Sequence, residues 1–195
     1  MPRISEAVKQ DHALIKRSFQ RLREADPETR KADEFVWALD RYLIVEDLVV
    51  SPALESHIAH GGERHRRLSD DFESVRLDSG SLPQSIQDLT VLQMNAKLRH
   101  MQRFNPAEPS FDSSLGAIWV DLEPHIREEA SSDLDLLEES LSEPDSEALG
   151  KKYEDIKELL QRPYGKDGIP DARTLSAILE MPRQELMVKV GVSTE

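Results

Sequence analysis

The amino-acid sequence predicts an all-α protein, an antiparallel four-helix bundle with extra helices at its C-terminal end. Four long segments carry apolar residues at steps of three and four, which is the spacing of one face of an α-helix. Mainly short connections join these segments, and this favours antiparallel neighbours. The C-terminal tail contains no stretch typical of a β-strand. At 195 residues, the chain has the length of one domain with one core.

The first predicted helix begins near Ser5, a residue type that caps helix N-termini, and ends at about Ala25, before Pro27. A histidine, His12, interrupts its apolar face near the middle. A lone histidine in such a position is more often a hydrogen-bonded core residue than a metal ligand. The face expected to be buried comprises Ile4, Val8, His12, Ile15, Phe19 and Leu22.

The second predicted helix, from about Arg30 to Ile58, carries a carboxylate, Glu46, within its apolar face. A buried carboxylate without a partner is costly, so it usually protonates, pairs with another group or binds a metal. Tyr42 lies one turn earlier on the same face, and a Tyr42–Glu46 hydrogen bond is the simplest interpretation. Pro52 is expected to bend the helix, because proline lacks the amide of the helical ladder. The buried face comprises Phe35, Leu39, Tyr42, Glu46, Val49 and Ala53.

A third helix is predicted over residues 82–104 and a fourth from about Ser113. The fourth helix places His125 and Glu129 four residues apart on its apolar face, the spacing of the tyrosine and the glutamate in the second helix. Pro124 removes a helical hydrogen bond directly before this pair and should kink the helix. The third face is broad and comprises Ile86, Leu89, Gln93, Ala96 and His100, with Val91, Met94, Leu98 and Met101 adjoining it. The fourth face comprises Leu115, Ile118, Leu122, His125, Glu129 and Leu136.

The domain organisation follows from these elements. Residues 1–143 are predicted to form the bundle, with the polar segment 59–81 as an insertion. A further helix is expected over residues 146–161, followed by two short helices split at Pro182. Residues 144–195 are therefore predicted to be a helical arm packed on the outside of the bundle.

Composition excludes several classes of function. The formal net charge of −13 would repel a nucleic acid over most of the surface. Cysteine is absent, which excludes disulfides, thiolate catalysis and sulfur-based zinc sites, so any metal must be held by nitrogen and oxygen. The sequence has neither an apolar run long enough to cross a membrane nor the apolar segment of a secretory signal. We therefore expect a cytoplasmic protein without a membrane partner.

Three of the four predicted helices carry a metal-ligand residue type at mid-height on the buried face, namely His12, Glu46 and the pair of His125 and Glu129. In an antiparallel bundle these heights can meet. Histidines and carboxylates that project inward are how such bundles build iron or manganese sites. The joint pattern is more specific than any one of the four residues.

Several segments of the sequence resemble motifs of one known family. VKQDH, at residues 8–12, looks like a first-helix histidine motif, and FVWALDRYLIVEDLVVSPALESH, at 35–57, is similar to a second-helix signature. A last helix with its acidic extension is resembled by residues 125–154, HIREEASSDLDLLEESLSEPDSEALGKKYE. A C-terminal arm is resembled by RPYG and TLSAILEMPRQEL. These motifs belong to the hemerythrin-like family, also called HHE cation-binding domains, and specifically to its fungal-type members. The resemblance covers nearly the whole chain. It implies a non-haem dinuclear iron site whose ligand positions are occupied by His12, Glu46, His125 and Glu129.

Two imidazoles of that site are missing from this sequence. Tyr42 stands where the family has its second-helix histidine. The third-helix histidine falls on Phe72 when residues are counted forward without gaps, and on Gln93 when they are counted back from Asn105. We prefer Gln93, because it lies on the expected buried face. With two imidazoles lost, we expect at most one ion, of iron or another divalent metal, and no reversible oxygen carriage.

Two other functions stay open at this point. One is a metal-free enzyme or small-molecule binder that uses Glu46, Glu129, His125 and Tyr42 in the bundle core, with a protonated glutamate as acid and His12 or His125 as base. Without metal, two close buried carboxylates repel each other, so one is expected to have a raised pKa. The other is an inert scaffold whose polar core needs only hydrogen bonds. The C-terminal arm could also support a homodimer.

Overall fold

The computed structural model describes residues 1–58, 94 and 96–160, and every regular element within these ranges is a helix. The elements are α1 (Ile4–Glu24), α2 (Asp33–Val45), the π-helical turn η1 (Glu46–Val50), α3 (Ser51–His57), α6 (Pro109–Glu128), the π-helical turn η2 (Glu129–Asp133), α7 (Leu134–Ser140) and α8 (Glu143–Leu159). Residues 94 and 96–101 are also helical. The prediction of an all-α helical bundle is confirmed.

Some of the predictions fall on residues that are not described. These are the insertion at 59–81, most of the third predicted helix, the alternative histidine positions Phe72 and Gln93, and the C-terminal helices around Pro182.

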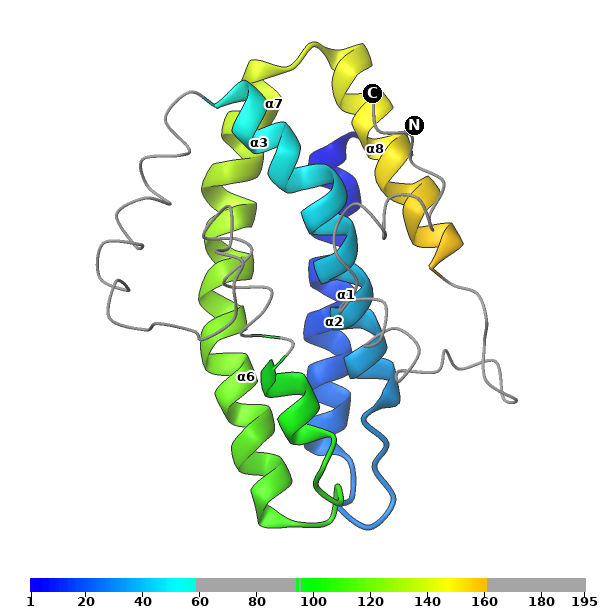
Figure 1. Cartoon of the computed structure of the whole chain (residues 1–195), viewed down its shortest axis with the longest axis vertical. Coiled ribbons are helices and arrows are strands. Elements are labelled where there is room, and N and C mark those ends of the chain that lie inside the picture. The colour runs from blue at the N-terminus through cyan, green and yellow to red at the C-terminus, as the bar shows by residue number, and fades with distance from the viewer. Residues whose placement is uncertain (59–93, 95, 161–195) are drawn as a thin grey trace, which may run out of the picture.

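The long helices pack side by side around a shared core (Figure 1). A short connection, residues 25–32, makes α1 and α2 antiparallel neighbours. The long helix formed by α6, η2 and α7 is also antiparallel to α1. Ser5 at the start of α1 donates its backbone N–H to Glu138 Oε1 of α7 at 3.1 Å, whereas Phe19 near the other end of α1 stacks on Trp119 of α6.

The buried faces predicted for the first two helices are confirmed, since none of their members is more than 6% exposed. In the second helix, residues 38–46 are all buried. This helix is therefore covered on every side, as is typical of a helix at the centre of a domain.

In the described part of the third predicted helix, only the adjoining apolar residues of the expected region are buried. Met94, Leu98 and Met101 are no more than 3% exposed, whereas Ala96 and His100 are exposed. The prediction that Ala96 and His100 face the core was wrong. The three larger apolar side chains remove more apolar surface from water than alanine and histidine would, and they set which face turns inward.

The fourth helix changes phase in its middle. Leu115, Ile118 and Leu122 are buried as predicted, but Leu136 is 43% exposed and Leu137 is fully buried in its place. The π-helical turn η2 contains one residue more than an α-helical turn, so every later side chain is rotated by about 100°. The prediction for Leu136 was wrong because it assumed an uninterrupted α-helix.

The second helix begins at Asp33 and not at Arg30. The side chain of Arg30 holds the connection that precedes this helix. Its guanidinium donates to Asp112 Oδ1 at 2.6 Å and to the Pro106 carbonyl oxygen, and it lies 4.7 Å above the ring of Phe111. These contacts fasten the connection before α2 to the start of α6. That start, at Pro109, lies earlier than predicted because proline suits the first helical turn.

α8 packs along α1 in the parallel direction. Ile4 donates its backbone N–H to Ser146 Oγ at 3.3 Å, and further along both helices the Tyr153 hydroxyl donates to Asp11 Oδ2 at 2.9 Å. Between these contacts, a Cβ on Gly150 would lie 2.2 Å from the Pro2 carbonyl oxygen. Only glycine permits this close approach.

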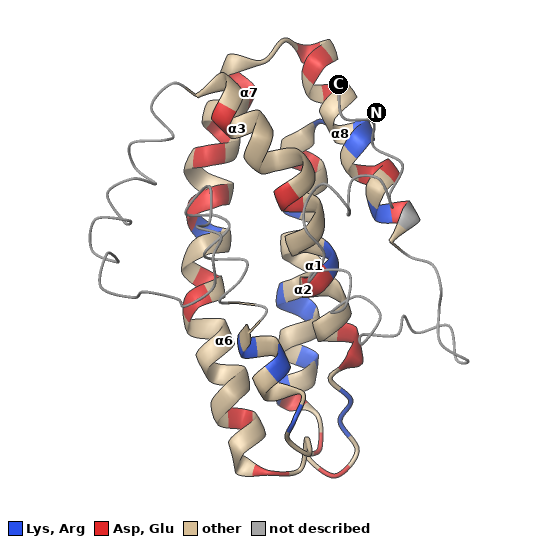
Figure 2. Ribbon diagram, viewed as in Figure 1, with Lys and Arg blue, Asp and Glu red and all other residues tan. Residues whose placement is uncertain are grey.

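Acidic side chains are spread along α6, α7 and α8 (Figure 2), in keeping with the net charge of −13. Among the described helices, none combines the length and apolar character needed to cross a bilayer.

Candidate metal centre

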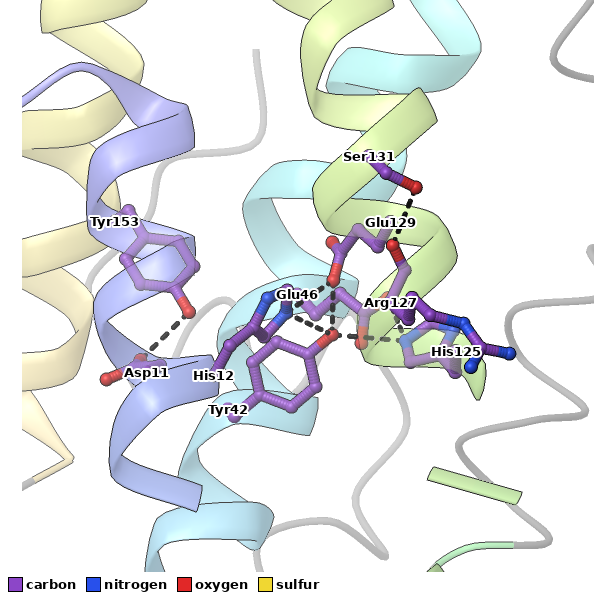
Figure 3. A network of polar contacts seen from close by, with 9 residues as sticks. All are labelled: Asp11, His12, Tyr42, Glu46, His125, Arg127, Glu129, Ser131 and Tyr153. Atoms are coloured by element: carbon purple, nitrogen blue, oxygen red, sulfur yellow. Dashed lines mark hydrogen bonds and ion pairs between the residues drawn. The ribbon is translucent and has the colours of Figure 1, made fainter. Parts of the chain in front are cut away.

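Five polar side chains from five elements meet at one level of the bundle (Figure 3). His12 comes from α1, Tyr42 from the end of α2, Glu46 from the start of η1, His125 from α6 and Glu129 from the start of η2. His12, Tyr42, Glu46 and Glu129 are no more than 3% exposed. The structure thus brings together all four residues predicted to be metal ligands, together with Tyr42.

Glu129 is the hub of this cluster. Its Oε2 atom accepts a hydrogen bond from the Tyr42 hydroxyl at 2.6 Å and lies 2.7 Å from His12 Nε2. Its other oxygen, Oε1, is buried and has no hydrogen-bond partner. A buried carboxylate oxygen without a partner is costly, and coordination of a cation would satisfy it.

His125 closes the other side of the cluster. Its Nε2 atom lies 3.3 Å from Glu46 Oε1 and 3.1 Å from the Tyr42 hydroxyl. Its side chain is 24% exposed, so the cluster meets solvent here. The sequence placed His125 on a fully buried face, and its partial exposure is a departure from that prediction.

The interpretation of Tyr42 as a partner of Glu46 also needs revision. The two residues lie one turn apart on the same helix, but the Tyr42 hydroxyl donates across the bundle to Glu129. Spacing along one helix correctly placed Tyr42 on the core-facing side. It could not indicate which of the facing helices would supply the nearest acceptor.

Both glutamates begin π-helical turns, η1 at Glu46 and η2 at Glu129. Such turns occur mostly as single insertions in α-helices and frequently lie at functional sites. The irregularity that the sequence suggested at Pro52 begins instead at Glu46, and the one suggested at Pro124 begins at Glu129. In each helix the last regular turn presents Tyr42 or His125, and the π-helical turn starts at the glutamate that follows.

Neighbouring groups in the cluster shift one another's pKa values. Burial alone would raise the pKa of Glu129, but the hydrogen bond from His12 and the charge of His125 outweigh this and hold its pKa below the usual 4.5. Burial would lower the pKa of His125, yet the neighbouring Glu46 raises it to about 9. Burial, together with the charges of Glu129 and Glu46, raises the pKa of Tyr42 well above 10. The raised carboxyl pKa expected of two close glutamates is therefore not found at Glu129.

Three of these residues form a candidate cation site. Ligand atoms of Glu46, His125 and Glu129 all lie within 4.8 Å of one another, and the His12 imidazole adjoins Glu129. Bonds from a metal to nitrogen or oxygen are about 2.0 to 2.2 Å long, so neighbouring ligand atoms on one ion lie about 3 to 3.5 Å apart. The 3.3 Å between His125 Nε2 and Glu46 Oε1 already has this value. The donor types therefore suit one ion that prefers nitrogen and oxygen, and one pair of ligand atoms already has the required spacing.

A second buried polar cluster was not predicted from the sequence. Asp11 accepts from Arg41 at 3.2 Å and from Tyr153, and its Oδ1 atom lies 3.0 Å from Lys157 Nζ. All four side chains are at least nine-tenths buried. The available signal was the charge of Asp11 directly beside His12, but only the position of α8 shows that this side of α1 is covered.

In the metal-free protein, we expect the free energy of unfolding to fall as the pH rises from 6.5 to about 9. Folding raises the pKa of His125, so its stabilising contribution is complete below pH 6.5, where both states carry the proton, and is lost above about 9. At 1.36 kcal/mol per pKa unit, the loss is on the order of 3 kcal/mol at most. Urea unfolding with a chelator present, at a series of pH values, measures it.

The matched variant for this measurement is His125→Gln, which should lack the slope over the same interval because no proton is exchanged there. Parallel curves for the parent and the variant would contradict the assignment of the slope to His125.

Comparisons with known proteins bear on the fold. No protein-family model matches the chain. A protein of Schizosaccharomyces pombe described as an uncharacterized hemerythrin-like protein is 26% identical over 163 residues, which are 82% of this chain and 71% of the yeast protein. Among solved structures, a hemerythrin HHE cation-binding domain-containing protein from Mycobacterium kansasii superposes with a TM-score of 0.60. It is 18% identical, and the match covers 97% of this chain and 98% of that chain, so it shows the fold.

Proposed function

We propose that this chain, a hemerythrin-like protein of the HHE class, holds a single metal ion in the core of its bundle and does not carry oxygen reversibly. The convergence of Glu46, His125 and Glu129 within 4.8 Å is the observation that carries this proposal. The buried Oε1 atom of Glu129, which lacks a hydrogen-bond partner, supports it. His12 would complete the set of ligands beside Glu129.

Iron is the ion that we propose, with manganese as the nearest competitor. Imidazole and carboxylate groups together suit these two metals, and cysteine, which would favour zinc or copper, is absent from the sequence. The description of the mycobacterial neighbour as a cation-binding domain supports a metal site.

A second ion would lack ligands among the residues that the structure describes. Of the histidines that the structure describes, His57 and His100 are exposed and only His12 and His125 reach the cluster. Neither Phe72 nor Gln93 offers an imidazole, whichever of them occupies the third-helix position. Within the described part of the chain, a coupled pair of irons would therefore share two imidazoles, too few for the bridged site that reversible oxygen binding needs.

The residues of the cluster have separate tasks in this proposal. Glu129 and Glu46 hold the ion from opposite helices, and the hydrogen bonds among His12, Tyr42 and Glu129 orient the ligands before the ion arrives. His125, with its 24% exposure, lies where a small molecule could approach. A bound iron would supply Lewis-acid and one-electron chemistry.

Metal analysis of the purified protein tests the proposal. After loading with Fe²⁺ or Mn²⁺ and removal of free metal, we expect about one ion per chain and no more, because two imidazoles cannot complete two coordination shells. Two tightly held ions per chain would contradict the single-ion site. A chain that retains none after loading would contradict metal binding altogether.

A metal-free catalyst is the second candidate function. One observation favours it, with a histidine in place of a glutamate as the acid. The pKa of His125 is raised to about 9, so this imidazole carries a proton at neutral pH. The acid of such a catalyst would thus be His125 and not a protonated Glu129, whose pKa is lowered. The substrate of such a catalyst would be a small molecule that binds in the bundle core and exchanges a proton with the partly exposed His125. Retention of activity after exhaustive chelation, once a substrate is known, would favour this candidate.

A further inference from the structure

We propose that Tyr42 binds the metal directly through its phenol oxygen and that the site therefore prefers Fe³⁺ to Fe²⁺. This inference rests on the proposed metal site and adds a ligand to it. Tyr42 stands at a position where the resemblance implies a histidine ligand. The tyrosine can either stay outside the coordination shell or bind the ion in place of the imidazole.

The phenol oxygen lies among the ligand atoms and not behind them. It is 2.6 Å from Glu129 Oε2, 3.1 Å from His125 Nε2 and 3.4 Å from His12 Nε2. Neighbouring ligands on one ion are about 3 to 3.5 Å apart. The distances to the two histidines match those between atoms that share a coordination shell, and the 2.6 Å distance to Glu129 is that of a short hydrogen bond. An ion bound to His125 and Glu129 would therefore lie within bonding reach of the phenol oxygen.

The Tyr42 ring cannot easily leave this place. Tyr42 is 0% exposed and lies on the part of the second helix where residues 38–46 are all buried. The His12 ring contacts it edge-on, with 5.3 Å between ring centroids, and the His125 ring lies 6.4 Å away on another side. Close-packed surroundings make a change of rotamer costly. The ion would therefore coordinate the phenol oxygen rather than displace it.

The charges of the site favour the same assignment. A buried ion needs its charge matched by its ligands, because an unmatched charge in a core is very costly. The carboxylates of Glu46 and Glu129 with a phenolate at Tyr42 bring three negative charges, which match Fe³⁺. On coordination the Tyr42 O–H bond breaks, the oxygen keeps the electron pair and bonds to iron, and the proton leaves to solvent. No electron is transferred in this step.

The alternative is that Tyr42 only orients Glu129 by a hydrogen bond while Glu129 binds the ion through Oε1. In that arrangement the hydroxyl keeps its proton and stays outside the coordination shell. The two arrangements differ in a spectroscopic signature, since a phenolate bound to Fe³⁺ gives a charge-transfer band in visible light and carboxylate and imidazole ligands alone do not.

The experiment is absorption spectroscopy of the full chain loaded with Fe³⁺, with iron quantified in the same samples. We expect a visible band in the parent and its complete loss in Tyr42→Phe, which keeps bound iron through the two glutamates. The matched control is Tyr153→Phe. Tyr153 is equally buried and also donates to a carboxylate, that of Asp11, but it lies outside the cluster. This variant should keep the band.

Each outcome decides one point. A parent that holds iron without a visible band, or a band that survives in Tyr42→Phe, would overturn the coordination of Tyr42 while leaving the metal site in place. Absence of bound iron in the parent and in both variants would overturn the proposed function as well. If Tyr42→Phe does not fold, resonance Raman of the parent with ring-deuterated tyrosine decides instead. Isotope-shifted phenolate modes that persist in Tyr153→Phe and Tyr164→Phe would support Tyr42, and their absence would overturn it.

Discussion

Replacing Glu129 by glutamine is expected to abolish metal binding and to remove the metal-dependent part of the stability. Glu129 contacts His12 and Tyr42 through one oxygen and keeps the other, without a hydrogen-bond partner, in the core. An ion bound to the folded state stabilises it by about 4 kcal/mol at a free concentration of 1,000 times the dissociation constant, and the variant loses this gain. Thermal unfolding with and without iron, together with metal analysis, measures both effects. Glu46→Gln should act in the same direction.

The matched control for these variants is Glu128→Gln. Glu128 precedes Glu129 on the same helix but is exposed, so its replacement should change neither metal content nor unfolding. The same measurements separate the three functions that the sequence left open. A catalytic pair without metal would lose turnover while keeping or gaining stability, and an inert core would leave both variants equal to the parent. Equal stability of the parent, Glu129→Gln and Glu46→Gln, with iron present and absent, would refute the metal site.

Replacing Asp11 by alanine is expected to lower the free energy of unfolding by about 3 to 5 kcal/mol, because it leaves the buried Arg41 without its carboxylate partner and leaves Lys157 with only Glu154, whose side chain is 39% exposed. Arg41 Nη2 and Lys157 Nζ lie 3.2 and 3.0 Å from Asp11 Oδ1, and all three side chains are buried. The Tyr153 hydroxyl loses its acceptor in the same substitution. Chemical unfolding of the metal-free protein at neutral pH measures the loss.

The control is Asp135→Ala, which removes an exposed ion pair with Lys9 between α7 and α1. Surface pairs of this kind contribute little, so a change within about 1 kcal/mol is expected. A similar small change in Asp11→Ala would show that solvent reaches Arg41 and Lys157 and that the cluster does not hold α8 against α1.

Much of this architecture could be predicted from the sequence because burial repeats with the period of the helix. The faces of α1 and of the second helix follow from that period alone, and the charged or polar residues on them, His12 and Glu46, identified the level at which the site lies. The pairing of His125 with Glu129 on the fourth helix was visible for the same reason. These predictions need no knowledge of which helices are neighbours.

The predictions that failed depend on neighbours or on local hydrogen bonding. The partner of Tyr42 is set by the distance between two helices, and the burial of Asp11 is set by where α8 lies. Leu136 was misplaced because no residue type in Glu129–Asp133 marks a π-helical turn in advance. In the third helix, Ala96 and His100 fit the helical period as well as Met94 and Leu98 did, and only the volume of the side chains decided between the two faces.

The two π-helical turns also affect how this chain can be aligned and altered. Each holds one residue beyond the α-helical count, and both begin at a glutamate of the same cluster. An alignment with an uninterrupted helix therefore needs a gap of one residue after Glu46 and another after Glu129. A deletion of one residue within 130–133 would convert η2 to an α-helical turn and rotate Leu134–Ser140 by about 100°, exchanging its core and solvent faces in part. Changes of length in this helix consequently act on its phase, whereas changes of length in a loop do not.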